Sequence, residues 1–189
     1  MSDLYIKLAQ HPVINSERLI LRPMTLDDTN ALFELTSDLE TAKYVSNIHR
    51  SLNDAADYIV TKFLNAPLGQ FAIEEKLTGK MIGSVSYNRI DSLMKTAEIG
   101  YMLNRHYWNK GYMTETLKTM LEYGFEKFEF NSLMAVFDKN NIASRKVILK
   151  SGLKYLFEDP YSRKDFIDPQ KNVTDVFYRL TKDEYFHPE

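Results

Sequence analysis

Short stretches rich in apolar residues, some of them alternating with polar ones, predict β-strands in this chain. Residues 18–24 form the first such stretch. Residues 70–75 and 80–90 predict a hairpin, because a glycine-containing turn separates them. Residues 95–103 alternate again and are expected to return as the third strand of an antiparallel meander.

Other stretches repeat their apolar residues with the 3.6-residue period of a helix. Thr25 and Ser51 are each followed three residues later by an aspartate, which is a capping-box signature of a helix N-terminus. The first of these helices is expected to reach about Thr36, and the second to end near residues 67–69. Residues 43–49, between the two helices, show no clear period.

A strand, a helix and a second strand are expected in the middle of the chain. The helix begins at Gly111 and runs to about Lys127, with apolar residues spaced three and four apart. Residues 132–137 are apolar almost throughout, as in a strand that is covered on both faces. Together with residues 95–103 they predict a parallel β-α-β crossover.

The last part of the chain predicts one more helix and two more strands. The helix covers residues 141–151, and Gly152 is placed to end it in a left-handed conformation. Residues 154–158 and 173–180 are expected to complete the sheet, with a polar loop at residues 160–171. No internal repeat or interdomain linker is visible, so a single domain is expected.

The turn before the Gly111 helix carries the first sign of chemistry, because it joins a lysine, Lys110, to a glycine. The first N–H groups of a helix lack intrahelical partners, and together with the helix dipole they attract phosphate. The turn therefore predicts a phosphate site. Taken alone, the turn fits an ordinary helix start with a solvated lysine better, so the interpretation as a phosphate site depends on a second element.

That second element follows about thirty residues later. It comprises residues 140–144, Asn-Asn-Ile-Ala-Ser, and residues 149–154, Leu-Lys-Ser-Gly-Leu-Lys. The turn at residues 108–115 reads Trp-Asn-Lys-Gly-Tyr-Met-Thr-Glu. The turn and this second element, in this order and at this separation, resemble the GNAT acetyltransferase superfamily. The closer resemblance is to the RimJ/RimL branch, the ribosomal-protein N-terminal acetyltransferases.

The resemblance extends over most of the chain, since residues 17–23 and 177–180 also look like the opening and closing strands of the family. It implies an α/β fold of the GNAT type with a mixed α+β sheet. The central sheet would be mostly antiparallel, with a parallel β-α-β crossover at the cofactor site and helices on both faces. One domain would cover residues 1–189, with its core at about residues 16–185.

The resemblance also implies acetyl-CoA as co-substrate, without a metal. Its pyrophosphate would lie on backbone amides of the turn. The family usually has glycine in place of Asn109 and alanine or glycine in place of Met113, so the Met113 side chain must point away from the phosphate. The expected cofactor-binding residues are Met102, Leu103, Arg105, Asn109, Lys110, Gly111, Tyr112, Met113, Thr114, Asn140 and Ser144.

The third strand is expected to align the thioester. Alternation places Glu98, Gly100 and Met102 on one face of this strand. In the family, the corresponding strand splays from its parallel neighbour. Backbone groups near Met102 and Leu103 would then pair with the pantetheine amides, and one N–H would stabilise the charge that develops on the acetyl oxygen.

Acetyl transfer to an amine needs a base for the amine and a proton for the departing thiolate. Glu98 is the preferred base, directly or through water, and the alternative is a surface carboxylate on a sheet face. Ser144 either protonates the thiolate, binds the cofactor only, or bonds a helix carbonyl. Asn140 contacts pantetheine or substrate, or else caps its helix. Tyr155 and Tyr178 are further hydroxyl candidates.

The composition of the chain excludes some classes of catalytic site and of binding partner. The chain has no cysteine, which excludes thiolate nucleophiles, and its four histidines lack metal-ligand spacing. A net charge of −2 argues against a nucleic-acid or anionic-membrane binder. No apolar run approaches the roughly 20 residues of a membrane span. The first residues show no export signal, so a cytoplasmic location is expected.

We therefore expect an acetyl-CoA-dependent N-acetyltransferase that acts on a protein or peptide α-amine, as on a ribosomal-protein N-terminus, by direct attack in a ternary complex. An α-amine has a reference pKa of about 8, against about 10.4 for the lysine side chain, so a weaker base can deprotonate it. The alternative acceptors are small amines such as polyamines, amino acids or aminoglycosides. A non-catalytic acyl-CoA-binding regulator is the alternative class. The chain is expected to be a monomer or a homodimer.

Overall fold

The computed structural model describes residues 3–188, which form one mixed sheet with helices on both faces. The strands are ordered β1-β2-β3-β4-β5-β6-β8-β7 across the sheet. Their bounds are β1 Ile14–Asn15, β2 Leu19–Arg22, β3 Gln70–Glu75, β4 Lys80–Asp91, β5 Thr96–Leu103, β6 Ser132–Asp138, β7 Lys154–Lys164 and β8 Asn172–Thr181.

The predicted meander is confirmed. Strands β2, β3, β4 and β5 pair with their neighbours in antiparallel fashion. Between Glu98 and Leu103 the pairing of β5 with β4 has no bulge, so side chains alternate regularly. Ile99 and Leu103 lie in one core and Met102 in the other, which confirms the predicted division of this strand into two faces.

Strands β5 and β6 form the predicted parallel pair, and they stay paired only over a short stretch. Residues 96–98 of β5 lie beside residues 132–134 of β6, and no pairing continues towards Leu103. Helix α5 (Tyr112–Glu126) connects the two strands. We call the opening beyond the last pair, Glu98 with Met134, the fork.

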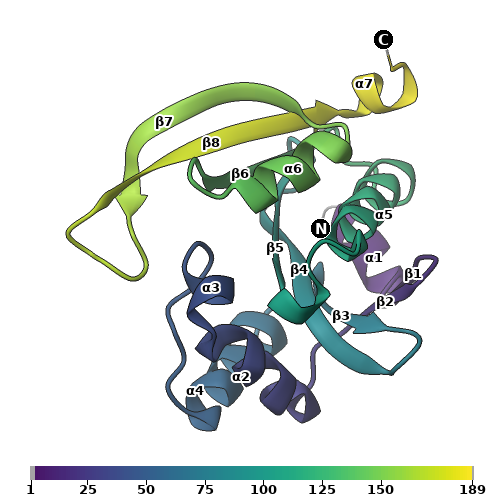
Figure 1. The fold of residues 1–189 in the computed structure, drawn as a ribbon. Helices are drawn as coiled ribbons and strands as arrows, with labels where there is room; N and C mark the ends of the chain where they lie inside the picture. The colour runs from purple at the N-terminus through teal and green to yellow at the C-terminus, as the bar shows by residue number, and fades with distance from the viewer. Residues whose placement is uncertain (1–2, 189) are drawn as a thin grey trace.

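Two apolar cores hold the helices against the sheet. On one face, the side chains of α5 and Ile148 of α6 (Ile142–Lys150) pack onto β3 to β6 and β8, together with Leu4 and Leu8 of α1 (Asp3–Gln10). On the other face, α2 (Thr29–Ser37), α4 (Leu52–Tyr58) and η2 (Ile59–Leu64) cover β3, β4 and the end of β5. Figure 1 shows α5 and α6 on one side, with α2, α3 (Leu39–Ala42) and α4 grouped at the other end.

The capping boxes begin their helices as predicted. Asp54 N–H donates to Ser51 Oγ at 3.1 Å, and Ser51 N–H donates to Asp54 Oδ2 at 3.1 Å. After Thr25 the chain first makes a short 3₁₀ helix, η1 (Leu26–Asp28), and then α2. Gly152, with φ of 90°, follows α6 as expected.

The prediction of a loop at residues 160–171 is wrong in its first part. Strand β7 continues to Lys164, and only residues 165–171 connect it to β8. The side chains of β7 are exposed along nearly its whole length, so no buried face imposed an apolar period on the sequence. In Figure 1 the β7–β8 hairpin arches across the top of the molecule, and its tip projects on the side of α3 and α4.

Three short helices were not predicted from the sequence: the terminal helices α1 and α7 (Lys182–Phe186), and α3. They have eight, five and four residues, too few to show a helical period clearly. No helix among residues 3–188 is long and apolar enough to cross a membrane.

Candidate functional site

Two cavities meet where β5 separates from β6. The first has a volume of about 420 Å³ and the second about 480 Å³. Both are lined by the same six residues at their junction: Tyr44, Val45, Tyr101, Met102, Asn141 and Ser144. The fork therefore lies between two compartments that open onto one another.

The N-terminus of α5 faces the first cavity. Gly111, with φ of 82°, caps the helix, and the N–H of Glu115 bonds to its carbonyl at 3.0 Å. The three N–H groups between them belong to Tyr112, Met113 and Thr114, and all three residues line the cavity. Because these groups precede the first intrahelical bond, they are available to a ligand.

The Met113 side chain points away from the cavity, since it is 5% exposed and packs in the core beneath α5. The predicted phosphate site requires this orientation, because the Met113 side chain would otherwise fill the space of the phosphate. The backbone amide of Met113 thus faces the cavity, while its side chain packs in the core.

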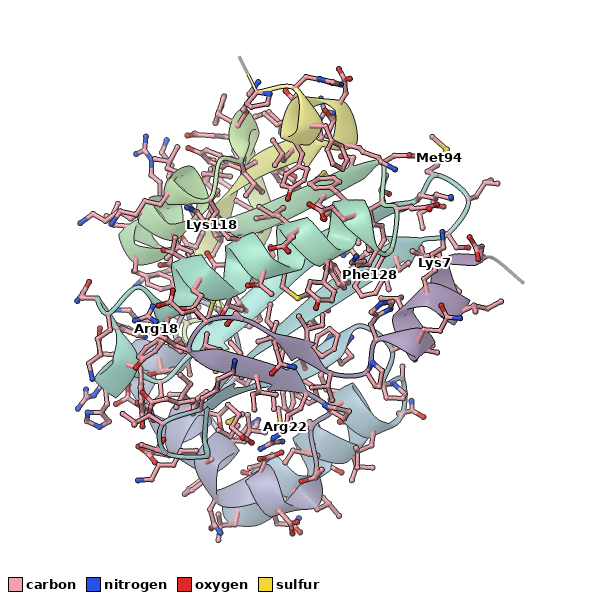
Figure 2. All side chains as sticks on the ribbon, turned by 90° about the vertical axis from the view of Figure 1, so that its right-hand side faces the viewer. Lys7, Arg18, Arg22, Met94, Lys118 and Phe128 are labelled. Carbon is pink, nitrogen blue, oxygen red and sulfur yellow. The ribbon has the colours of Figure 1, made fainter. Side chains whose placement is uncertain are left out.

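Arg18 and Glu115 hold the turn in place. Glu115 accepts hydrogen bonds from the backbone N–H of Arg18 at 2.8 Å, from Arg18 Nε at 2.7 Å and from Ser16 Oγ at 2.7 Å. Arg18 Nη1 donates to the Lys110 carbonyl at 2.9 Å. The guanidinium lies 4.4 Å from the centre of the Tyr112 ring. Figure 2 shows Arg18 near the N-terminal end of α5, with Phe128 beyond its other end.

The cations of the first cavity differ from those expected. Arg105 pairs with Asp38 at 3.2 Å, and Lys110 lies 5.2 Å from the Tyr107 ring; neither lines the cavity. Lys146 and Lys150 of α6 line it instead. Their i, i+4 spacing, which places both on one helix face, was the available sequence signal.

The backbone of β5 offers hydrogen-bonding groups at the fork. Asn104 N–H bonds to the Ile82 carbonyl of β4 at 2.9 Å. Because antiparallel pairs alternate, the N–H and C=O of Tyr101 and Leu103 then face away from β4, towards the fork. Those of Met102 face β4, so Met102 reaches the cavities with its side chain. Trp108 Nε1 donates to the Leu103 carbonyl at 2.7 Å.

The start of α6 forms the opposite side of the fork. Asn141 caps the helix by accepting a hydrogen bond from Ser144 N–H at 3.0 Å, so the predicted alternative of a cap at Asn140 is wrong. Asn140 is exposed, lines the first cavity and accepts a hydrogen bond from Tyr44 at 3.3 Å. Ser144 lines both cavities, and its Oγ makes no hydrogen bond within the described chain.

The second cavity lies on the sheet face that carries Glu98. The β7–β8 hairpin and η2, a π-helix, form opposite walls. Residues of η2 that line it are Lys62 and Phe63, and π-helical turns recur at functional sites. From the hairpin come Asp159, Ser162, Arg163, Phe166, Asp175 and Phe177.

Glu98 lies on the floor of this cavity with its side chain 17% exposed. Burial raises the pKa of its carboxyl, and the charge of Asp175 raises it further. Arg89, which donates to Glu98 Oε2 at 2.9 Å, and Lys62 oppose the shift without cancelling it. A carboxylate with a raised pKa, half-enclosed in a cavity, has the properties of a general base.

The hydroxyl candidates lie elsewhere. Tyr178 is 3% exposed within the core and Tyr155 is 58% exposed, and neither lines a cavity at the fork. Tyr101 brings a hydroxyl to the fork instead. It donates to the Ser144 carbonyl at 3.4 Å, and burial raises the pKa of Tyr101 to about 12.

Comparisons with known proteins agree with this geometry. A family model described as an acetyltransferase (GNAT) domain matches residues 18–154. The N-acetyltransferase p20 of Bacillus licheniformis, itself uncharacterized, is 31% identical over 175 residues, which cover 90% of this chain and 96% of the relative. The ribosomal-protein-serine acetyltransferase of Escherichia coli is 26% identical over 53% of this chain and 55% of the relative.

Solved structures show the same fold. A GNAT-family acetyltransferase from Bacillus anthracis superposes with a TM-score of 0.78 and 23% identity, over 91% of this chain and 99% of the other. A ribosomal L7/L12 α-N-protein acetyltransferase in complex with coenzyme A superposes with a TM-score of 0.77 and 18% identity, over 89% and 97%. This chain is an N-acetyltransferase and belongs to the GNAT family.

Proposed function

We propose that this enzyme transfers the acetyl group of acetyl-CoA to the N-terminal α-amine of a protein or peptide. The observation that carries the proposal is the meeting of two cavities at the fork. One holds the helix N-terminus and the lysines suited to an anion, and the other holds a carboxylate with a raised pKa.

The first cavity fits the coenzyme. The N–H groups of Tyr112, Met113 and Thr114 would bind its pyrophosphate, with Lys146 and Lys150 as counter-charges. Backbone groups of Tyr101 and Leu103 at the fork match the amides of its pantetheine arm. Acetyl-CoA supplies the acetyl group as a thioester, and the chain's part is to hold that group at the fork.

Glu98 acts on the acceptor. It takes a proton from the ammonium form of the amine, directly or through water, and the neutral nitrogen then attacks the acetyl carbon. As the carbon–sulfur bond breaks, the sulfur takes the proton of the Ser144 hydroxyl, and Ser144 recovers a proton from the nitrogen, which becomes the neutral amide. No covalent acyl-enzyme is needed, because the amine reaches the fork from the second cavity while the donor occupies the first.

Two relatives support a ribosomal acceptor. The E. coli relative is named for acetylating serine of a ribosomal protein, and the structural neighbour with coenzyme A is named for L7/L12. A fungal relative named FsC-acetyl coenzyme A-N(2)-transacetylase, which is not named for a ribosomal protein, matches 92% of this chain at 23% identity, so acceptors other than ribosomal proteins are tested as well.

A panel of amines separates these acceptors. The panel contains peptides with free N-terminal serine or alanine, a lysine side-chain peptide, spermidine, free amino acids and an aminoglycoside, and thiol release from acetyl-CoA is measured. Turnover on the N-terminal peptides at a kcat/KM at least about tenfold above the others supports the proposal. A higher value for a small amine contradicts the acceptor class, and tight coenzyme binding without turnover on any amine contradicts catalysis.

A further inference from the structure

A buried carboxylate in the second cavity has an oxygen without a partner. Asp175 of β8 lines this cavity and is 7% exposed. Its Oδ2 accepts hydrogen bonds from Ser162 Oγ at 2.9 Å and Arg163 Nε at 3.2 Å. Its Oδ1 is buried and accepts no hydrogen bond within the described chain.

A buried acceptor without a hydrogen-bond donor is energetically unfavourable, because it loses its bonds to water and no protein donor replaces them. We therefore expect a donor to bind this carboxylate. The nearby cations do not provide it. Arg163 is bound to Oδ2 and lies over the Phe166 ring at 4.6 Å. Lys62 Nζ donates to Asn88 Oδ1 at 2.9 Å, and Arg89 donates to Glu98.

Asp175 and Glu98 face the same cavity from the same side of the sheet. Glu98 is paired with Met134 of β6, and Asp175 is paired with Asp138 four residues further along β6. Positions 134 and 138 lie on one face of β6, and paired residues share a face. The charge of Asp175 is one of the causes that raise the pKa of Glu98, after burial.

We propose that Asp175 binds the amine of the acceptor in its protonated form, with its carboxylate accepting one of the ammonium N–H groups. This inference rests on the acetyl transfer proposed above and adds its acceptor-binding residue. A primary ammonium has three N–H donors, so its binding to Asp175 leaves two N–H groups from which Glu98 can take a proton, directly or through water. The site therefore selects primary amines that enter as cations over neutral hydroxyl acceptors and over the acetylated product.

The test measures acceptor binding separately from chemistry. Protein loaded with coenzyme A is titrated by calorimetry at about pH 6.5, below the α-amine reference pKa of about 8. The probes are a serine-initiated hexapeptide with a free α-amine and the same peptide acetylated at its N-terminus. We expect the wild type to bind the free amine at least about tenfold more tightly, and Asp175→Asn to reduce that ratio to near one.

Kinetics give a second readout. In Asp175→Asn the KM for the peptide should rise about tenfold or more, kcat should change less than about threefold, and the dissociation constant of coenzyme A should stay the same. The control variant Asp28→Asn removes a carboxylate that is also buried (5% exposed) and bound by an arginine, Arg22, but that lines neither cavity. A purely structural role for Asp175 would raise KM equally in this control and so overturn the inference.

The outcomes also separate this inference from the proposed function. If the wild type does not acetylate the peptide, the peptide acceptor is refuted, and the same comparison is made with spermidine and N-acetylspermidine. If the wild type acetylates either amine and folded Asp175→Asn keeps the wild-type binding ratio, Asp175 is not the ammonium-binding residue. If Asp175→Asn does not fold, Asp175→Glu is measured instead, because it keeps the negative charge. This variant should fold and still bind the free amine more tightly than the acetylated probe. Equal binding of the two probes by Asp175→Glu would contradict the inference.

Discussion

Asn109 occupies a backbone conformation that most side chains avoid. Its φ is 60°, in the left-handed region, where asparagine is among the few residues other than glycine that occur regularly. Asn109 therefore allows the turn the path that a glycine would take, because its short amide side chain tolerates these backbone angles.

Glu98 is the residue on which the proposed chemistry most depends. We expect Glu98→Gln to lower kcat about 100-fold or more, since an amide cannot accept the proton of the amine. Because burial raises the pKa of Glu98, the acidic limb of the wild-type kcat profile should lie above the ordinary glutamate value of 4.5. A kcat profile from pH 5 to 9 checks both points, and this limb should be missing in the variant.

The same shift affects stability with a defined sign. A carboxyl whose folded pKa is raised favours the folded state below its unfolded pKa, and that contribution is lost as pH rises through the folded pKa. Glu98→Gln should therefore gain stability relative to the wild type between pH 4.5 and neutrality, in denaturant titrations at several pH values. Glu122→Gln, at an exposed site on α5, is the control and should change neither profile.

The turn into α5 shows how an element creates a binding surface from its backbone alone. Gly111 must adopt a left-handed φ of 82°, and a Cβ placed there would lie 3.4 Å from Arg18 Nη2. We expect Gly111→Ala to lower the free energy of unfolding by about 1–2 kcal/mol. It should also raise the dissociation constant of coenzyme A, because the N–H groups of the turn would move. Thermal unfolding and calorimetry measure the two effects.

Gly79→Ala is the matched control for this change. Gly79 has φ of 65° in the β3–β4 turn, and nothing lies within 4 Å of a Cβ placed there. The backbone strain should be similar, while coenzyme binding should stay at the wild-type value. Equal losses of coenzyme affinity in both variants would mean that global destabilisation, and not the geometry of the turn, explains the result.

Elements with many buried side chains were predictable from the sequence. Helix α5 and strands β3, β4, β5 and β6 have buried residues that leave either a regular period or a continuous apolar run in the sequence. Strand β7 lies at the edge of the sheet with exposed side chains, so its second half gave no such signal. Its length is instead determined by pairing with β8, and pairing partners are not visible in a single sequence.

Some residues of the candidate site could be predicted from the sequence and others could not. Residues 109–114 and Ser144 belong to local sequence patterns, and the structure brings most of them to the first cavity. Asp175, Lys62 and Arg163 reach the second cavity through the tertiary arrangement of η2 and the hairpin. Nothing in the sequence near each of them distinguishes it from other surface charges, so these residues could not be predicted.

At the scale of the whole molecule, the two cavities draw on different parts of the chain. The residues that line the first come from 40–45, β5, the α5 turn and the region of α6, and none of those described comes from β7 or β8. The second depends on the β7–β8 hairpin. Coenzyme binding and acceptor binding should therefore respond separately to changes in the hairpin.

Shortening the hairpin tests this separation. Residues 165–171 connect Lys164 to its pairing partner Asn172, and an Asn-Gly turn can replace them. The change removes Phe166 from the second cavity and frees Arg163, which stacks on its ring. We expect kcat/KM for the acceptor to fall about tenfold and coenzyme affinity to stay within about twofold. A parallel loss of coenzyme affinity would show that the hairpin supports both cavities.

The fork in the sheet also bears on self-association. Unpaired strand edges invite other chains to add to a sheet and so promote aggregation. Here the unpaired backbone of β5 faces a gap between two strands of its own chain and not the outer edge of the sheet. The outer edges are protected differently, since β1 has only two residues and β7 contains Pro160. The protein can thus keep backbone donors open for its substrate without offering them as a seed for fibrils.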